Sequence, residues 1–189
     1  FLAEKECGFQ MEMEKRIGIY RYCVSKVIAT IVSAFLLAVA SILLFLGLLT
    51  LLRIPHVLQN ESMAIYYEGL CVTKGVGWYY CVKIVLTGVG CSFSAMFALF
   101  ISSYIPNAYA SMLSPMIGYY LWNSILNLLF PLLPSSIIWQ MVSPLNLFFA
   151  QVWLGSSLLS FLWTILFLTL ITAFLGIQFV KRVCMGVAK

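Results

Sequence analysis

The sequence contains no aspartate and one histidine, and it has no charged residue or histidine between Ile84 and Val180. A soluble domain needs polar side chains facing water, so a stretch of this length without charge excludes a soluble globular protein. The same absence argues against an intramembrane enzyme, which needs a nucleophile with a base or a set of metal ligands. It also argues against an ion-coupled transporter, because such proteins normally use a titratable group inside the membrane.

What is present is apolar. The chain is 63% hydrophobic and only 9% charged, with a mean hydropathy of +1.03, whereas soluble proteins are about 25% charged. We therefore predict an all-α polytopic membrane protein. The net charge of +5 does not indicate nucleic-acid binding, because the cations flank apolar stretches, where the positive-inside rule places them.

Four apolar stretches are long enough to cross the hydrocarbon core, which takes about 20 helical residues. They cover approximately residues 27–52, 78–104, 110–129 and 152–180. Small residues between Gly88 and Ser94 suit close helix contact in the second stretch. In the third stretch, Asn123 and Asn127 share one helical face, and they predict either interhelical hydrogen bonds or contacts along a substrate pathway.

Two of the three connections between these spans are long. Residues 53–77 form a polar loop, and residues 130–151 are apolar but interrupted by Pro131, Pro134 and Pro144. We expect external re-entrant helices over 130–151, because broken backbone at membrane depth must be covered by protein or water. Cys71 and Cys81 either pair or remain separate small apolar residues, and the sequence leaves both alternatives open.

Residues 1–26, here called the charged segment, carry nine of the 17 charged residues. Apolar side chains in it recur at helical spacing and predict an amphipathic helix along the membrane surface: Phe9, Met13, Ile17, Tyr20 and Val24. We expect breaks at Gly8 and Gly18, which are weak helix formers. The alternative interpretation is a generic juxtamembrane segment.

The distribution of lysine and arginine predicts the orientation. Five lie in the charged segment and three in the tail, residues 181–189, against three between Arg53 and Lys83. With four crossings, the positive-inside rule makes both ends of the chain cytosolic and residues 53–77 and 130–151 external.

The charged segment contains Glu4-Lys5-Glu6-Cys7-Gly8, then Arg16-Ile17-Gly18, then Arg21-Tyr22-Cys23-Val24-Ser25-Lys26 before the first span. This order resembles type-2 ABC exporter permeases, in which a charged segment with a glycine follows the second membrane helix and forms the coupling helix. Asn107-Ala108-Tyr109-Ala110 followed by Pro115 is similar to that family's turn into its fifth helix, and 130–151 is similar to its external re-entrant helices. The resemblance covers nearly the whole chain, and it implies that the family's first two helices would precede Phe1.

The resemblance implies a permease subunit of an ATP-driven exporter in the cell membrane. Its partners would be an ATP-binding cassette ATPase subunit, a second permease subunit, identical or different, and membrane lipid. ATP would be bound by the ATPase partner, since this chain has no GxxxxGK[ST] phosphate-binding loop. No catalytic, cofactor or metal residue is therefore expected.

The resemblance also implies contacts between the charged segment and the ATPase. The implied polar docking residues are Glu4, Glu6, Glu12, Arg16 and Arg21, with Phe9 and Met13 as apolar anchors. For each charged residue, the alternative is contact with water or lipid headgroups. For the whole chain, the alternative is a four-helix membrane protein that acts as an assembly, scaffold or immunity factor without a motor.

Overall fold

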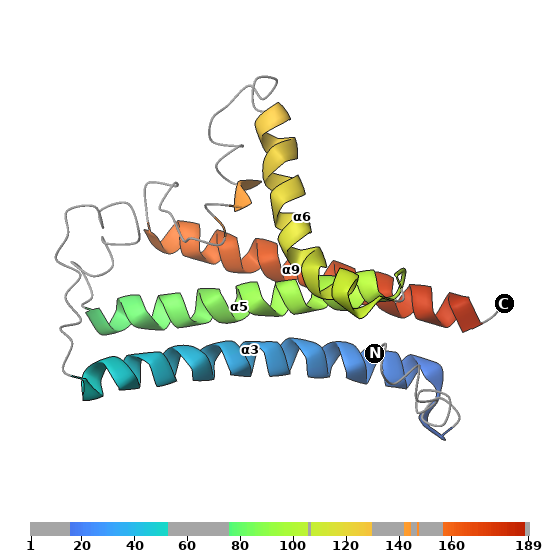
Figure 1. Cartoon of the computed structure of the whole chain (residues 1–189), viewed down its shortest axis with the longest axis horizontal. Helices are drawn as coiled ribbons and strands as arrows, with labels where there is room; N and C mark the ends of the chain where they lie inside the picture. Colours follow the sequence, from blue (N-terminus) through green and yellow to red (C-terminus); the bar gives the residue numbers. More distant parts are fainter. Residues whose placement is uncertain are drawn as a thin grey trace.

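The computed structural model describes residues 16–52, 76–105, 107–129, 142–144, 147 and 157–187. Four long helices dominate this part of the chain. They are α3 (Ile19–Leu51), α5 (Val76–Ser102), α6 (Ala108–Leu129) and α9 (Ser157–Val187). In Figure 1, α3, α5 and α9 run alongside one another, whereas α6 stands steeply against them. The predicted all-α class is confirmed.

The core of the bundle lies where the start of α3 meets the ends of α5 and α9. One cluster of buried side chains joins the three helices: Tyr22, Cys23, Met96, Leu99, Leu175, Phe179 and Val183. Helix α3 is therefore antiparallel to α5 and α9, and α5 is parallel to α9 (Figure 1). The first turns of α3 and the last turns of α9 consequently lie at the same end of the bundle.

Three of the helices contain segments long and apolar enough to cross a membrane: Ile19–Leu51, Tyr80–Ser102 and Leu159–Met185. The chain is a multi-pass membrane protein. Helix α6 forms where the third span was expected, but it is not among these three segments. The physical reason lies in its composition, because Pro115, Asn123 and Asn127 interrupt its apolar residues and lower its hydropathy.

Helix α3 begins earlier than the predicted first span. Gly18 has a φ of 87°, in the left-handed region that glycine enters without steric cost, and the helix runs without interruption from Ile19 through Lys26. The predicted break at Gly18 is confirmed, while the helix starts eight residues before the expected boundary at residue 27.

The break also interrupts the predicted apolar stripe. Within the described part of the charged segment, Ile17 and Tyr20 are exposed, whereas Tyr22 and Cys23 are buried against the bundle. The stripe is therefore not the face that packs in the core. A helical period cannot be carried across Gly18, because the left-handed residue changes the direction of the chain.

Small residues bring the helices close together, as the sequence predicted for the stretch from Gly88 to Ser94. A Cβ atom at Gly88 would lie 2.6 Å from the ring of Phe35 in α3. One turn later, the Ser92 hydroxyl lies 3.1 Å from the carbonyl oxygen of Ile31, also in α3. These two contacts fix α5 against the middle of α3.

The proline in α6 leaves no unpaired carbonyl. Pro115 lacks the N–H that would bond the carbonyl of Ser111 four residues earlier. The hydroxyl of Ser114 donates to that carbonyl at 2.7 Å. A side-chain hydroxyl therefore supplies the bond that the backbone cannot make, which is the usual condition for proline inside a membrane helix.

Asn107 begins α6 by acting as its N-cap. Its side-chain oxygen accepts hydrogen bonds from the backbone N–H groups of Tyr109 at 2.9 Å and of Ala110 at 3.3 Å. The turn expected before this helix is confirmed for its described residues, and the cap explains where the helix starts.

We expect Asn107→Ala to destabilise the protein by about 1 kcal/mol, because two N–H groups lose their acceptor. Asn107→Asp, which keeps an acceptor oxygen, should retain wild-type stability. Thermal unfolding of the detergent-purified protein measures both variants. Equal melting temperatures for the alanine and aspartate variants would contradict the capping role.

Candidate functional site

A cavity with a volume of about 470 Å³ lies between α5 and α6. Side chains of both helices line it: Phe93, Ser94, Phe97, Pro115, Met116, Gly118, Tyr119 and Trp122. Half of these residues are aromatic, against 15% aromatic residues in the whole chain. We call it the aromatic cavity.

Glycine determines how closely the two walls of the aromatic cavity approach. A Cβ atom at Gly118 would lie 2.9 Å from the ring of Phe97, so any larger residue there would displace that ring. Across the cavity, Phe93 and Trp122 meet edge to face with ring centroids 6.4 Å apart. Such pairs add about 0.5–1.5 kcal/mol beyond the area they bury.

Aromatic contacts continue from the aromatic cavity to α9. The ring of Trp122 lies 6.2 Å from that of Phe167, which stacks on Trp163 at 6.1 Å. Helix α6 thus reaches α9 through Trp122. Among the described residues, this aromatic contact packs α6 against α9.

A second cavity, of about 360 Å³, lies between α3, α5 and α9. Its walls are mostly aliphatic or hydroxylated, with one aromatic ring: Ile31, Val32, Phe35, Leu36, Val89, Ser92, Thr169, Thr172 and Ala173. We call it the aliphatic cavity. The hydroxyls of Thr169 and Thr172 donate to carbonyls of their own helix. Neither hydroxyl therefore needs a ligand to accept its hydrogen bond.

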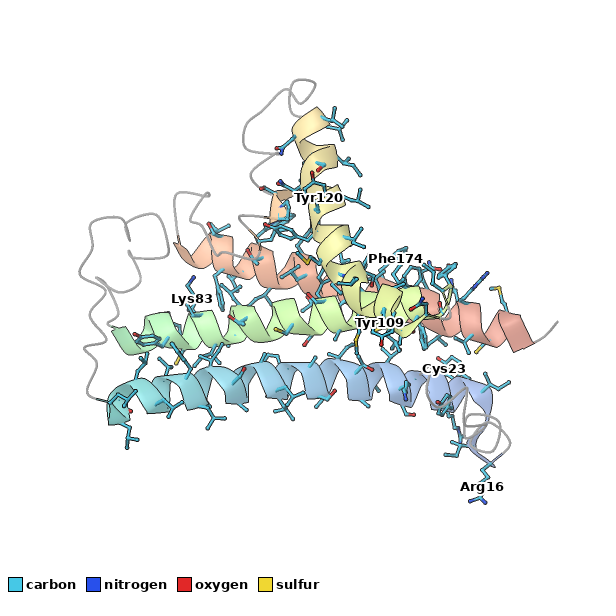
Figure 2. All side chains as sticks on the ribbon, in the orientation of Figure 1. Arg16, Cys23, Lys83, Tyr109, Tyr120 and Phe174 are labelled. Atoms are coloured by element: carbon cyan, nitrogen blue, oxygen red, sulfur yellow. The ribbon has the colours of Figure 1, made fainter. Side chains whose placement is uncertain are left out.

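Positive charge gathers at the end of the bundle that holds the buried cluster. Arg16, Arg21 and Lys26 belong to the start of α3 and the residues just before it, and Lys181 and Arg182 belong to the last turns of α9. In Figure 2, Arg16 and Cys23 lie at this end and Lys83 lies toward the other. The guanidinium of Arg182 sits 4.5 Å from the ring centroid of Tyr104, a cation–π contact that holds the end of α9 against the end of α5.

The structure describes only some of the residues that the sequence singled out. Glu4, Glu6, Phe9, Glu12 and Met13 lie outside the described residues. Both described members of the docking set, Arg16 and Arg21, are exposed at the cationic end.

Asn123 and Asn127 do not take part in either cavity. Asn123 is half-buried and Asn127 is exposed, and neither is among the lining residues of the aromatic or the aliphatic cavity. The face of α6 that lines the aromatic cavity carries Pro115, Tyr119 and Trp122 instead.

Sequence reasoning missed the aromatic cavity, although a signal for it exists. Phe93 and Phe97 are four residues apart, and Pro115, Tyr119 and Trp122 follow one another at spacings of four and three. Each set therefore occupies one helical face. What the spacing does not indicate is that the two faces oppose each other.

Within the described residues, no three histidine, cysteine, aspartate or glutamate side chains lie close enough together to hold a metal ion. Cys81 is a free thiol. Comparison of the chain with protein-family profiles, with curated proteins and with solved structures gives no match.

Proposed function

We propose that the chain is the membrane-spanning permease subunit of an ATP-driven exporter, as its resemblance to type-2 ABC exporter permeases implies. The observation that carries the proposal is the convergence of both cation-rich flanks on one end of the bundle. The end of the charged segment and the end of α9 meet there through Tyr22, Cys23, Phe179 and Val183. A cytosolic ATPase that bound this end would contact both flanks at once.

The direction of the helices supports four crossings. Because α5 and α9 run parallel, the chain between Ser102 and Ser157 must return from one end of the bundle to the other. Helix α6 begins at the end of α5 and is the described helix of that connection (Figure 1). In this arrangement α6 is the third crossing, residues 130–151 form external re-entrant helices, and both ends of the chain lie in the cytosol of a cell whose plasma membrane holds the protein.

The energy for transport comes from a partner in this proposal. The sequence has no phosphate-binding loop, and no aspartate, glutamate, lysine, arginine or histidine occurs between Ile84 and Val180, so ATP is bound and hydrolysed on the ATPase subunit. Its closure reaches the membrane helices as a rigid-body tilt transmitted through the charged segment. A second permease subunit packs beside this one, and α3 offers exposed apolar side chains for that contact or for lipid, among them Leu37, Leu44 and Phe45.

Co-purification of the full-length protein from its native membrane tests the proposal. We expect an ATPase subunit with a phosphate-binding loop to be retained with the wild-type protein. The double variant Glu6→Lys/Glu12→Lys should lower the retained ATPase at least about tenfold, because reversed charges face the docking surface. Membrane insertion should be unchanged.

The matched control is Glu61→Lys/Glu68→Lys, which makes the same change in the segment predicted to be external. It should retain the ATPase as the wild type does. If the wild-type protein purifies with no ATPase, the exporter proposal is wrong and the assembly, scaffold or immunity alternative stands.

A further inference from the structure

We infer that the aromatic cavity between α5 and α6 is a binding site for a flat, uncharged, largely apolar small molecule that enters from the lipid bilayer. The inference is independent of the proposed function, because binding can be measured without an ATPase. If the chain is a permease, the molecule bound at this site is either the transported substrate or a modulator of its transport, and the cavity indicates its chemical class.

The volume of the aromatic cavity is suited to such a molecule. Cavities that hold drug-sized ligands measure about 300–1,000 Å³ and are lined by apolar and aromatic side chains with few polar groups. The aromatic cavity has about 470 Å³, and three of its eight lining side chains carry a polar group: Ser94, Tyr119 and Trp122. The Ser94 hydroxyl already donates to the Gly90 carbonyl of its own helix at 3.0 Å. A ligand with several polar groups would therefore find few partners.

The depth of the cavity indicates the route of entry. Phe93 and Phe97 lie in the second half of the candidate span Tyr80–Ser102, so the walls of the cavity are at the level of hydrocarbon. Met116 lines the cavity and is exposed on the outside of α6. A molecule dissolved in the bilayer can reach the site without crossing water.

The contrast with the aliphatic cavity indicates a flat ligand rather than a flexible acyl chain. Four aromatic residues line the aromatic cavity: Phe93, Phe97, Tyr119 and Trp122. Phe35 is the one ring that lines the aliphatic cavity. Aliphatic walls are sufficient for an acyl chain, whereas ring faces and edges add energy for a planar ligand.

None of the described residues that line the aromatic cavity is charged, which indicates a neutral ligand. No carboxylate occurs between Gly69 and Lys189 in the sequence, so neither helix of the cavity supplies a counter-ion for a cation. A cation taken out of water at this depth would have only ring faces for compensation, and desolvation of an unpaired charge is costly.

Photolabelling of the full-length protein in phosphatidylcholine nanodiscs tests the inference, with 1-azidopyrene as the probe and unlabelled pyrene as the competitor. We expect saturable labelling, mapped by mass spectrometry to residues 93–97 and 115–122, that excess pyrene suppresses. Labelling that does not saturate would show that the probe partitions into the bilayer without a discrete site, and it would overturn the inference. Suppression by tetraphenylphosphonium but not by pyrene would overturn the neutral ligand class.

Two pairs of variants locate the site. Ser94→Phe fills the aromatic cavity and should reduce saturable labelling at least about tenfold, which corresponds to about 1.4 kcal/mol. Thr169→Phe fills the aliphatic cavity instead and should leave labelling unchanged, since both hydroxyls bond only their own helices.

The second pair of variants makes side chains smaller instead of larger. It therefore tests the site even if the Ser94→Phe variant does not fold. Phe97→Leu removes one ring from the aromatic cavity and should weaken binding about fivefold. Phe35→Leu removes the ring of the aliphatic cavity and should not change binding. Equal effects of the two leucine variants would overturn the assignment of the site to the aromatic cavity.

Discussion

Replacing Phe179 by alanine is expected to destabilise the bundle by about 3 kcal/mol, the largest effect that we predict for a single side chain. Phe179 is 0% exposed and lies in the cluster that joins the start of α3 to the ends of α5 and α9. Removal of its ring leaves a void between three helices. The atoms around the void lose their van der Waals contacts with the ring, and neither lipid nor water replaces those contacts.

Phe174 is the matched control. It lies on the same helix but is 58% exposed (Figure 2). Phe174→Ala should change stability by less than about 0.5 kcal/mol, as surface substitutions do. The two variants thus compare the same chemical change inside and outside the cluster.

Cys23 provides a local measurement of this prediction. It belongs to the same cluster and is 1% exposed, so its thiol reacts only when this end of the bundle opens. In a background where the other cysteines are serine, Phe179→Ala should increase the rate of maleimide labelling of Cys23 about a hundredfold, the factor that about 3 kcal/mol produces. Equal labelling rates in the Phe179→Ala and Phe174→Ala variants would contradict the role of the cluster.

Gly88→Ala is expected to have the second largest effect, a destabilisation of about 1–3 kcal/mol. The added Cβ would meet Phe35 at 2.6 Å, so the ring or one of the helices has to move. Since the Ser92 hydroxyl touches the Ile31 carbonyl one turn away, a shift of α5 from α3 would also break that hydrogen bond.

The rescue variant separates this clash from a simple effect of helix propensity. Phe35→Leu removes the ring, so the double variant with Gly88→Ala should be less destabilised than the sum of the two single changes. Gly47→Ala is the control, because a Cβ there meets nothing within 4 Å. Thermal unfolding of the purified protein measures all four variants, and additivity in the double variant would contradict the contact between Gly88 and Phe35.

Much of the fold can be predicted from the sequence because it depends on local patterns. Uncharged runs of 20 or more residues predict the long helices, Gly18 predicts the break before α3, and Asn107 predicts the turn before α6. The small residues at Gly88 and Ser92 predict a close helix contact. Each of these signals belongs to a single stretch of chain.

What could not be predicted depends on how distant stretches meet. The buried face of α3 is set by Tyr22 and Cys23 against α9, and nothing within residues 16–26 indicates this pairing. The aromatic cavity likewise needs Phe93 and Phe97 to face Trp122 across two helices. Asn123 was singled out for its polarity, yet the cavity wall lies one residue away, at Trp122, because helical phase rather than chemical type decides which side chain faces inward.

The bond between Ser114 and the Ser111 carbonyl has a mechanical consequence. A backbone hydrogen bond fixes the angle between successive helical turns, but a hydroxyl can rotate and follow its acceptor while that angle changes. Helix α6 can therefore flex at Pro115 at little energetic cost, whereas α3, α5 and α9 contain no proline. Since Pro115 also lines the aromatic cavity, bending of this one compliant helix alters the space that a bound molecule would occupy.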